Sequence, residues 1–132
     1  MIVGVGIDLV SVSRIKKILG QVWAHRFVER VFTPQEIAQC SKTINPEERF
    51  AGKFAAKEAA VKALGTGFSL GISPNQIMIT DGVKQRPSIL LSLMAKKVAE
   101  SKGIDNIVVS ISHTDGMASA IVIMEKTSRN LL

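Results

Sequence analysis

The sequence predicts an α+β fold, in which an antiparallel sheet packs against one long helix and several shorter helices. Residues 46–64 carry uninterrupted helical signals between a proline start and a glycine stop. Two Val/Ile-rich segments, 107–114 and 117–124, flank an Asp-Gly pair, which is the strongest hairpin signal of the chain. The 132 residues suffice for one core, so we expect a single domain over 1–132.

The N-terminal segment 2–10 is rich in Val and Ile and predicts a strand. Strand alternation divides it into an apolar face (Val3, Val5, Ile7, Leu9) and a face of Gly4, Gly6 and Asp8. Such glycines allow another backbone or a ligand to come close, and both interpretations stay open. Asp8 is either a strand-end residue in a turn or a carboxylate with a buried partner.

Three short helical stretches follow. Ser11 or Ser13 can cap a helix starting near Arg14, and a second stretch covers 22–31. Thr33-Pro34-Gln35-Glu36 has a capping-box pattern and opens a helix to about Ser41.

The long helix begins after Asn45 and ends at Leu64, before a loop with glycines at 65, 67 and 71. Beyond it we expect strands at 76–80 and 88–91 around an Asp81-Gly82 turn, a helix over 92–101, and the C-terminal hairpin.

Composition restricts the class of protein. With 46% apolar and 21% charged residues the chain is an ordinary globular protein, and its net charge of +6 favours anionic ligands or an acidic partner. Cys40 is the only cysteine, which excludes an internal disulfide and a Cys-rich zinc site and suggests a reducing, cytoplasmic setting. The N-terminus lacks signal-peptide features, and no apolar stretch is long enough to span a membrane.

The long helix carries unusual charges. Phe50, Phe54 and Val61 lie within about 40° of one another and define its apolar stripe, and Lys57 falls inside that stripe. A lysine there needs a counter-charge, for which a phosphate would serve.

Two further groups of charges lie on this helix. Glu58 and Lys62 are one turn apart; they form either a surface pair or part of a site. A second row on the helix, at four-residue spacing, consists of Arg49, Lys53 and Lys57. If these residues have no role in a site, they form a solvated basic ridge.

Two short motifs follow. The Gly65-Thr66-Gly67 loop either exposes backbone N–H groups to an anion or is a plain helix cap, and it is not a Walker loop. Near the chain's end, His113 shares a strand face with Val109 and Ile111, whereas Ser110, Ser112 and Thr114 share the other. Asp8 and Glu58 are the two candidate acids; two carboxylates suit Mg²⁺ with substrate phosphates, and the basic surroundings argue against a glycosidase pair.

In combination these motifs resemble the 4′-phosphopantetheinyl transferases. The resemblance rests on Gly6-Ile7-Asp8, on FAAKEAAVKA at 54–63, on GTG at 65–67 and on SISHT at 110–114, all in order along nearly the whole chain. The short length and the start IDLV at 7–10 resemble the bacterial holo-acyl-carrier-protein synthase branch of that family.

The resemblance implies an enzyme that moves 4′-phosphopantetheine from coenzyme A to a serine of an acyl carrier protein, releasing adenosine 3′,5′-bisphosphate, in support of fatty acid biosynthesis. It implies that Asp8 and Glu58 hold Mg²⁺, with Glu58 the suggested base, and that Lys62 and Lys57 neutralise phosphate. It further implies that a set of residues lines the coenzyme A site, namely Gly65, Thr66, Gly67, Ser112, His113 and Thr114. Arg14 would dock an acidic carrier helix, and the family is typically homotrimeric, with active sites between subunits.

Two other hypotheses stay open. A nucleic-acid-binding module would explain the charge of +6 and the basic row, but it leaves Asp8 and Glu58 without a role. A non-catalytic regulatory domain would bind coenzyme A without turnover. Transfer assays with coenzyme A, Mg²⁺ and an apo carrier protein distinguish these hypotheses.

Overall fold

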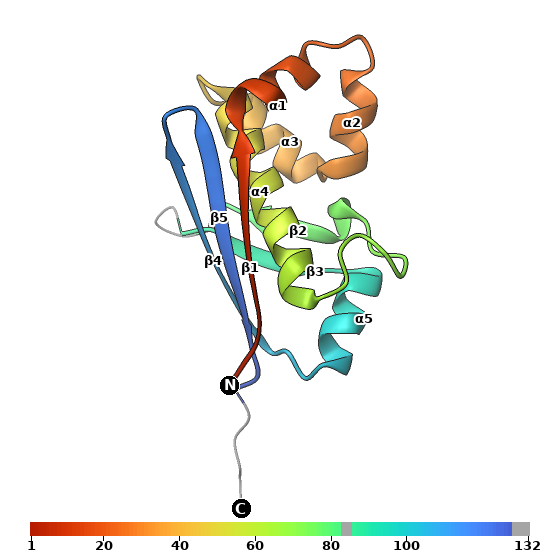
Figure 1. Ribbon diagram of the computed structural model, residues 1–132. Coiled ribbons are helices and arrows are strands. Elements are labelled where there is room, and N and C mark those ends of the chain that lie inside the picture. Colours follow the sequence, from red (N-terminus) through yellow and green to blue (C-terminus); the bar gives the residue numbers. More distant parts are fainter. Residues whose placement is uncertain (83–85, 128–132) are drawn as a thin grey trace, which may run out of the picture.

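The computed structural model describes residues 1–82 and 86–127, and it confirms the α+β class. Figure 1 shows the long helix α4 (Pro46–Leu64) running behind a three-stranded sheet. Strands β1 (Ile2–Ser11), β5 (Met117–Glu125) and β4 (Asn106–Thr114) form this sheet in the order β1-β5-β4, and both pairings are antiparallel. A second antiparallel pair, β2 (Ile77–Thr80) and β3 (Ser88–Leu91), forms a separate sheet, so the one sheet expected from the sequence is two.

The shorter helices gather around α4. Helices α1 (Val12–Leu19), α2 (Ala24–Val31) and α3 (Pro34–Ser41) lie together at one end of the molecule, and α5 (Leu93–Ser101) lies beside β2 and β3 at the other (Figure 1). A short 3-10 turn, η1 (Pro74–Gln76), leads into β2. Among the described residues, no helix is both long and apolar enough to cross a membrane.

Local signals set most element ends as expected. Ser11 caps α1 by accepting from the Arg14 amide, and the capping box of Thr33 and Glu36 opens α3. Gly65 ends α4 with a left-handed φ of 80°, which only glycine adopts readily. The hairpin turns at Asp115 and Gly116, both with positive φ. The connection predicted at Asp81-Gly82 runs through residues 83–85, which lie outside the described residues.

Helix α4 is covered on more sides than a single apolar stripe predicts. Its alanines at 51, 55, 56, 59, 60 and 63 are all buried, together with the larger Phe50, Val61 and Leu64. Phe54, expected in the buried stripe, is only partly buried. Small side chains around the helix allow the main sheet and the β2–β3 pair to pack closely against it, so α4 is the centre of the core.

The glycine face of β1 packs directly on α4. A Cβ atom at Gly6 would overlap the carbonyl oxygen of Ala59, and one at Gly4 would overlap that of Ala63. Of the two interpretations of these glycines, the close approach of another backbone is therefore the one found. The space beside Gly4 and Gly6 belongs to α4 and not to a ligand.

The opposite face of β1 is exposed. Val5, Ile7 and Leu9 point away from α4, and Ile7 and Leu9 are 65% and 64% exposed. In β5, Ile121 stands beside Ile7 and is also exposed. A row of large aliphatic side chains thus lies on the outer side of the main sheet, and these side chains stay exposed among the residues that the structure describes.

We expect Gly6→Ala to destabilise the protein by about 3 kcal/mol, the upper end of the overpacking range, because the obstacle is helix backbone and cannot move aside. Urea unfolding measures the loss. Gly20→Ala is the matched control: the nearest atoms to its added Cβ lie at 3.6 Å, so its free energy of unfolding should stay within about 0.5 kcal/mol of wild type. Equal stability of the two variants would contradict the packing described here.

Candidate active site

The contact between β1 and α4 brings Asp8 to Lys62. Asp8 lies on the inner face of β1, and its side chain is 17% exposed. The Lys62 ammonium donates to Oδ1 of Asp8 at 3.1 Å and to the carbonyl of Ile7 at 3.0 Å. The lysine itself is about half exposed, so its ammonium can move to another anion at small cost.

Glu58 lies one turn before Lys62 and faces the same cavity as Asp8. Asp8, Glu58 and Arg14 all line a cavity of about 470 Å³ between β1, α1, α2 and α4. Burial raises the pKa of the Glu58 carboxyl, the negative charge of Asp8 raises it further, and Lys62 lowers it in part. The two acids and the arginine singled out in the sequence therefore meet at one site.

The donor set suits a hard divalent cation that keeps part of its water. No group of three or more His, Cys, Asp or Glu side chains that would hold a metal by itself is found in residues 1–82 and 86–127. Burial and the charge of Asp8 nevertheless both raise the pKa of Glu58, and Lys62 offsets this only in part, so a cation bound beside the two carboxylates would stabilise the ionised form of Glu58. Mg²⁺ bound through one or two carboxylates together with substrate phosphates fits this arrangement.

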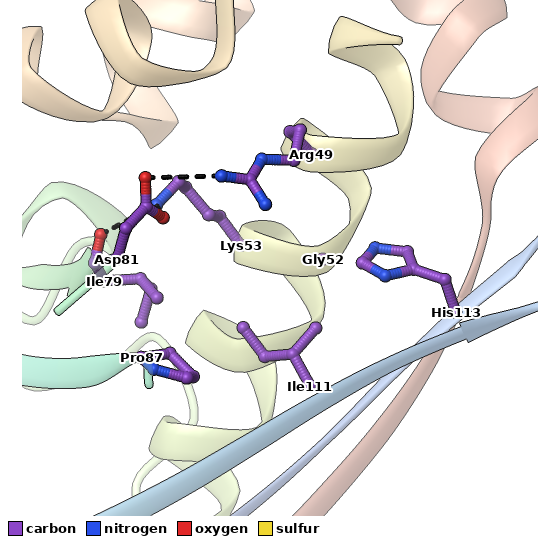
Figure 2. A pocket seen from close by; sticks show the side chains of 8 residues that line it. All are labelled: Arg49, Gly52, Lys53, Ile79, Asp81, Pro87, Ile111 and His113. Atoms are coloured by element: carbon purple, nitrogen blue, oxygen red, sulfur yellow. Dashed lines mark hydrogen bonds and ion pairs between the residues drawn. The ribbon is translucent and has the colours of Figure 1, made fainter. Parts of the chain in front are cut away.

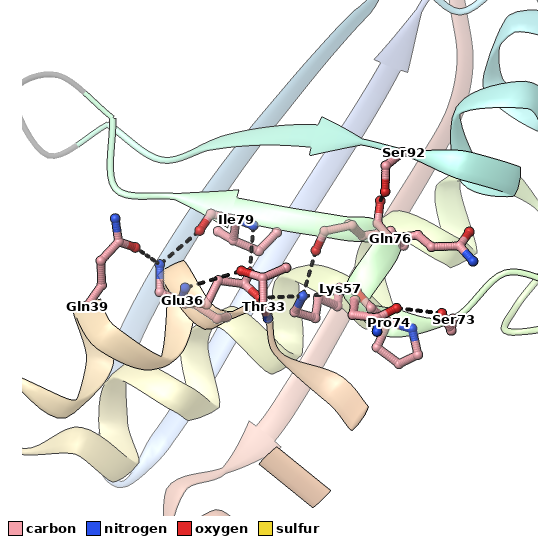
Figure 3. A network of polar contacts seen from close by, with 12 residues as sticks. Thr33, Glu36, Gln39, Lys57, Ser73, Pro74, Gln76, Ile79 and Ser92 are labelled. Atoms are coloured by element: carbon pink, nitrogen blue, oxygen red, sulfur yellow. Dashed lines mark hydrogen bonds and ion pairs between the residues drawn. The ribbon is translucent and has the colours of Figure 1, made fainter. Parts of the chain in front are cut away.

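Lys57 is not at this site. Its side chain is fully buried, and its ammonium pairs with Oε1 of Glu36 at 2.8 Å while donating to the carbonyls of Ile77 and Pro74 (Figure 3). Burial lowers the pKa of Lys57, and the nearby Glu36 carboxylate opposes that shift. The expectation that Lys57 neutralises phosphate is thus corrected: its counter-charge is a glutamate from another helix.

The Gly65-Thr66-Gly67 loop caps α4. The backbone N–H groups of all three residues donate to the carbonyl of Val61, at 3.1 to 3.3 Å. The ammonium of Lys102 donates to the last carbonyl of the helix, that of Leu64. These amides are therefore not available to an anion, and the helix-cap interpretation is the one found. A contact of this loop with coenzyme A stays a prediction from the family resemblance.

The Ser112-His113-Thr114 segment divides between the two faces of the sheet. His113 is on the inner face, where its Nε2 lies 3.0 Å from the carbonyl oxygen of Glu48 at the start of α4. Ser112 pairs with Ser119 of β5 on the exposed outer face. Thr114 lines a small cavity beside the hairpin turn, together with His113. The three residues therefore do not form one surface.

A second polar cavity, of about 280 Å³, lies on another side of α4, between β2 and β4. Figure 2 shows its lining, in which Asp81 faces Arg49 and Lys53, while His113 and Ile111 approach from the main sheet. Lys53 is only 4% exposed and donates to Asp81 at 2.9 Å, and Arg49 pairs with the same carboxylate at 3.4 Å. The hypothesis of a solvated basic ridge is thus wrong, because two of its three members are buried and paired.

No sequence motif indicates that Asp81 and Pro87 line this cavity. The only signal in the chain was the four-residue spacing of Arg49 and Lys53, which places both on one side of the helix. Their partner comes from the end of a strand far along the chain, and no local pattern indicates it.

Comparison with known proteins agrees with these motifs. Residues 4–114 match the family model described as the 4′-phosphopantetheinyl transferase superfamily. A holo-[acyl-carrier-protein] synthase of Solibacter usitatus is 40% identical over 125 residues, covering 95% of this chain and 99% of the relative. The crystal structure of the enzyme of that name from Neisseria meningitidis superposes with a TM-score of 0.87 at 32% identity, covering 96% of this chain and all of the other.

The Helicobacter pylori holo-[acyl-carrier-protein] synthase, solved in complex with coenzyme A, superposes with a TM-score of 0.80 at 36% identity, covering 92% of this chain and 99% of that one. The chain therefore belongs to the 4′-phosphopantetheinyl transferase superfamily.

We expect Glu58→Gln to be more stable than wild type above pH 4.5. Folding raises the pKa of Glu58 from its ordinary 4.5, so the native state binds more protons than the unfolded chain, and its stability from this group is lost as pH rises through the folded pKa. Glutamine does not titrate and avoids that loss. Urea unfolding between pH 4 and 8 should show the difference appearing as pH rises, with Glu100→Gln, at an exposed position of α5, as control. Greater stability of wild type at pH 8 would contradict the assignment.

Proposed function

We propose that this chain is a magnesium-dependent holo-acyl-carrier-protein synthase, which transfers 4′-phosphopantetheine from coenzyme A to a serine of an apo acyl carrier protein. The names of its relatives and the coenzyme A bound to one of the similar structures support the reaction and its donor. The observation that carries the proposal in this chain is the cavity shared by Asp8 and Glu58, with Lys62 paired to Asp8. We further propose that the enzyme works in the cytoplasm for fatty acid biosynthesis, and the buried free thiol of Cys40 fits a reducing compartment.

Asp8 and Glu58 would hold Mg²⁺, which supplies charge neutralisation and alignment to the diphosphate of coenzyme A. In the reaction the serine oxygen bonds to the β-phosphorus, the bond from that phosphorus to the bridging oxygen breaks, and adenosine 3′,5′-bisphosphate leaves. Lys62, half exposed, neutralises phosphate charge. The serine hydroxyl also loses a proton, and Glu58 would accept it, because this carboxyl lies in the cavity where the diphosphate would be held.

Arg14 supports docking of an acidic carrier protein. It lies in the first turns of α1 and lines the same cavity as the two acids, and Lys16 and Lys17 follow it in the last turn of α1. A carrier bound to this positive helix would bring its serine to the cavity mouth. Electrostatic attraction of this kind raises the association rate and weakens with salt.

The second cavity suits the nucleotide part of coenzyme A, because its two cationic side chains, Arg49 and Lys53, outnumber the single carboxylate of Asp81 there. At 100° per residue, Lys53 and Glu58 lie about 140° apart around α4. The two cavities of one chain therefore face different sides of the helix. One coenzyme A molecule would reach both kinds of cavity most easily where the first cavity of one copy lies beside the second cavity of a neighbouring copy. We accordingly propose a homotrimer with its active sites between subunits.

The exposed outer face of the main sheet supports this assembly. This face carries an exposed aliphatic surface formed by Val5, Ile7 and Leu9 of β1 and Ile121 of β5. Exposure of aliphatic side chains to water is unfavourable, and their burial would stabilise an assembly. A second copy of the chain would cover this surface. The nucleic-acid hypothesis loses its main support, since Lys53 and Lys57 are not on the surface.

The transfer assay tests the reaction. With coenzyme A, Mg²⁺ and an apo carrier, we expect the carrier to gain one phosphopantetheine group by mass spectrometry, and no gain in EDTA. Asp8→Ala and Glu58→Ala should each fold and lose about a hundredfold or more in rate, while Glu100→Ala on α5 keeps wild-type activity. Near-normal rates in either variant would overturn the metal assignment. Coenzyme A binding without modification of several different carriers would favour the regulatory hypothesis instead.

The assembly is tested by light scattering after size exclusion. We expect wild type to have three times the chain mass of 14.2 kDa, and Ile7→Glu to have the mass of one chain, because the variant would bury like charges in the interface. Val22→Glu is the control, since Val22 is also aliphatic and is even more exposed, but it lies between α1 and α2, away from the sheet. A monomeric wild type, or an Ile7→Glu variant that keeps the wild-type mass, would contradict the proposal.

A further inference from the structure

A glycine stands inside α4 at a position where local preference argues against it. Gly52 lies in the first half of the helix and is buried. Glycine is unfavourable in a helix interior relative to alanine, and the neighbouring buried positions of α4 at 51, 55 and 56 are alanines. Position 52 therefore requires the absence of a side chain for a reason other than helix formation.

The reason is the ring of His113. A Cβ added at Gly52 would lie 2.9 Å from Nε2 and 3.2 Å from Cε1 of His113, and 3.1 Å from Cγ2 of Ile111. The imidazole thus rests directly on the backbone of α4, as Figure 2 shows from the side of the second cavity. Any side chain at position 52 would push the ring away from the helix.

The ring makes a directed contact at this place. Its Nε2 lies 3.0 Å from the carbonyl oxygen of Glu48, which can only accept, so Nε2 carries a proton. In a regular helix the same carbonyl accepts from the amide of Gly52, four residues later, and its second lone pair remains for the histidine. The ring reaches that lone pair by passing over position 52. The contact leaves Nδ1 as the second polar atom of a ring that lines the cavity of Arg49 and Lys53.

We propose that Gly52 is a positioning residue for ligand binding: it lets His113 donate from Nε2–H to the Glu48 carbonyl, which fixes the orientation of the ring and leaves Nδ1 to contact a ligand beside Arg49 and Lys53. Protonated Nδ1 donates to an anionic oxygen, and unprotonated Nδ1 accepts from a hydroxyl or amine. The identity of the ligand, the nucleotide part of coenzyme A, rests on the function proposed above, whereas the positioning of the ring does not.

Nitrogen-15 NMR of the ligand-free protein tests the positioning. We expect the wild-type His113 shifts to report the Nε2–H tautomer when the ring is neutral, and Gly52→Ala to move them toward a mixture with Nδ1–H. Gly20→Ala makes the same substitution where no side chain is contacted, and it should leave the His113 shifts unchanged. Wild-type shifts in Gly52→Ala, or an Nδ1–H tautomer in wild type, would overturn the proposal.

Binding of adenosine 3′,5′-bisphosphate by calorimetry tests the consequence in a double-mutant cycle. Gly52→Ala and His113→Ala should each weaken binding about tenfold, the size of one hydrogen bond to a charged group. The double variant should bind no more weakly than His113→Ala, because Gly52 acts through the ring. If the losses of binding free energy in the two single variants add up in the double variant, Gly52 affects binding independently of the His113 ring, and the proposal is overturned.

Two further outcomes are decisive. If Gly52→Ala does not fold, the double variant, which lacks the obstructing ring, should fold; its failure to fold would place the clash elsewhere and reject the proposal. If wild type does not bind the bisphosphate, the function proposed above is rejected for this cavity, and the NMR result alone decides the positioning role.

Discussion

The backbone contact between β1 and α4 is the constraint on which the candidate site depends. Gly4 and Gly6 have no side chains, so the strand lies against the carbonyls of Ala59 and Ala63. This close packing places Asp8, two residues beyond Gly6, within ion-pair distance of Lys62. A strand held one side chain further from the helix would separate the aspartate from the helical charges by several ångströms, and the shared cavity would lose its second carboxylate.

Helix α4 serves two kinds of polar interaction on different sides. Inside the protein, Lys57 and Glu36 form a buried pair, and the second oxygen of Glu36 accepts from the amide of Ile79 in β2 (Figure 3). Each buried charge in this network has a partner, which offsets the desolvation that an isolated charge would suffer. The network joins α3, α4 and β2 and so holds the helix in place relative to the second cavity. Glu58, the next residue after Lys57, faces the first cavity instead.

Several features of this chain are unfavourable for the stability of the isolated fold. Burial and the charge of Asp8 both disfavour the ionised form of Glu58, and Gly52 interrupts a run of good helix formers. The outer face of the main sheet likewise leaves Ile7 and Leu9 exposed. Each feature costs stability in the isolated chain, and each is accounted for by a proposed interaction with a cation, a ligand or a second copy.

The sequence by itself determined the elements and their ends, because caps, glycine stops and the Asp115-Gly116 turn act between residues close together in the chain. It also singled out Asp8 and Glu58, since carboxylates beside glycines or on an apolar helix are unusual in any context. Only the tertiary structure decided what each polar group meets. Lys57 needed a counter-charge, but whether a phosphate or Glu36 supplied it depended on the packing of α3. Such long-range partners follow from how whole elements pack, and no local spacing encodes them.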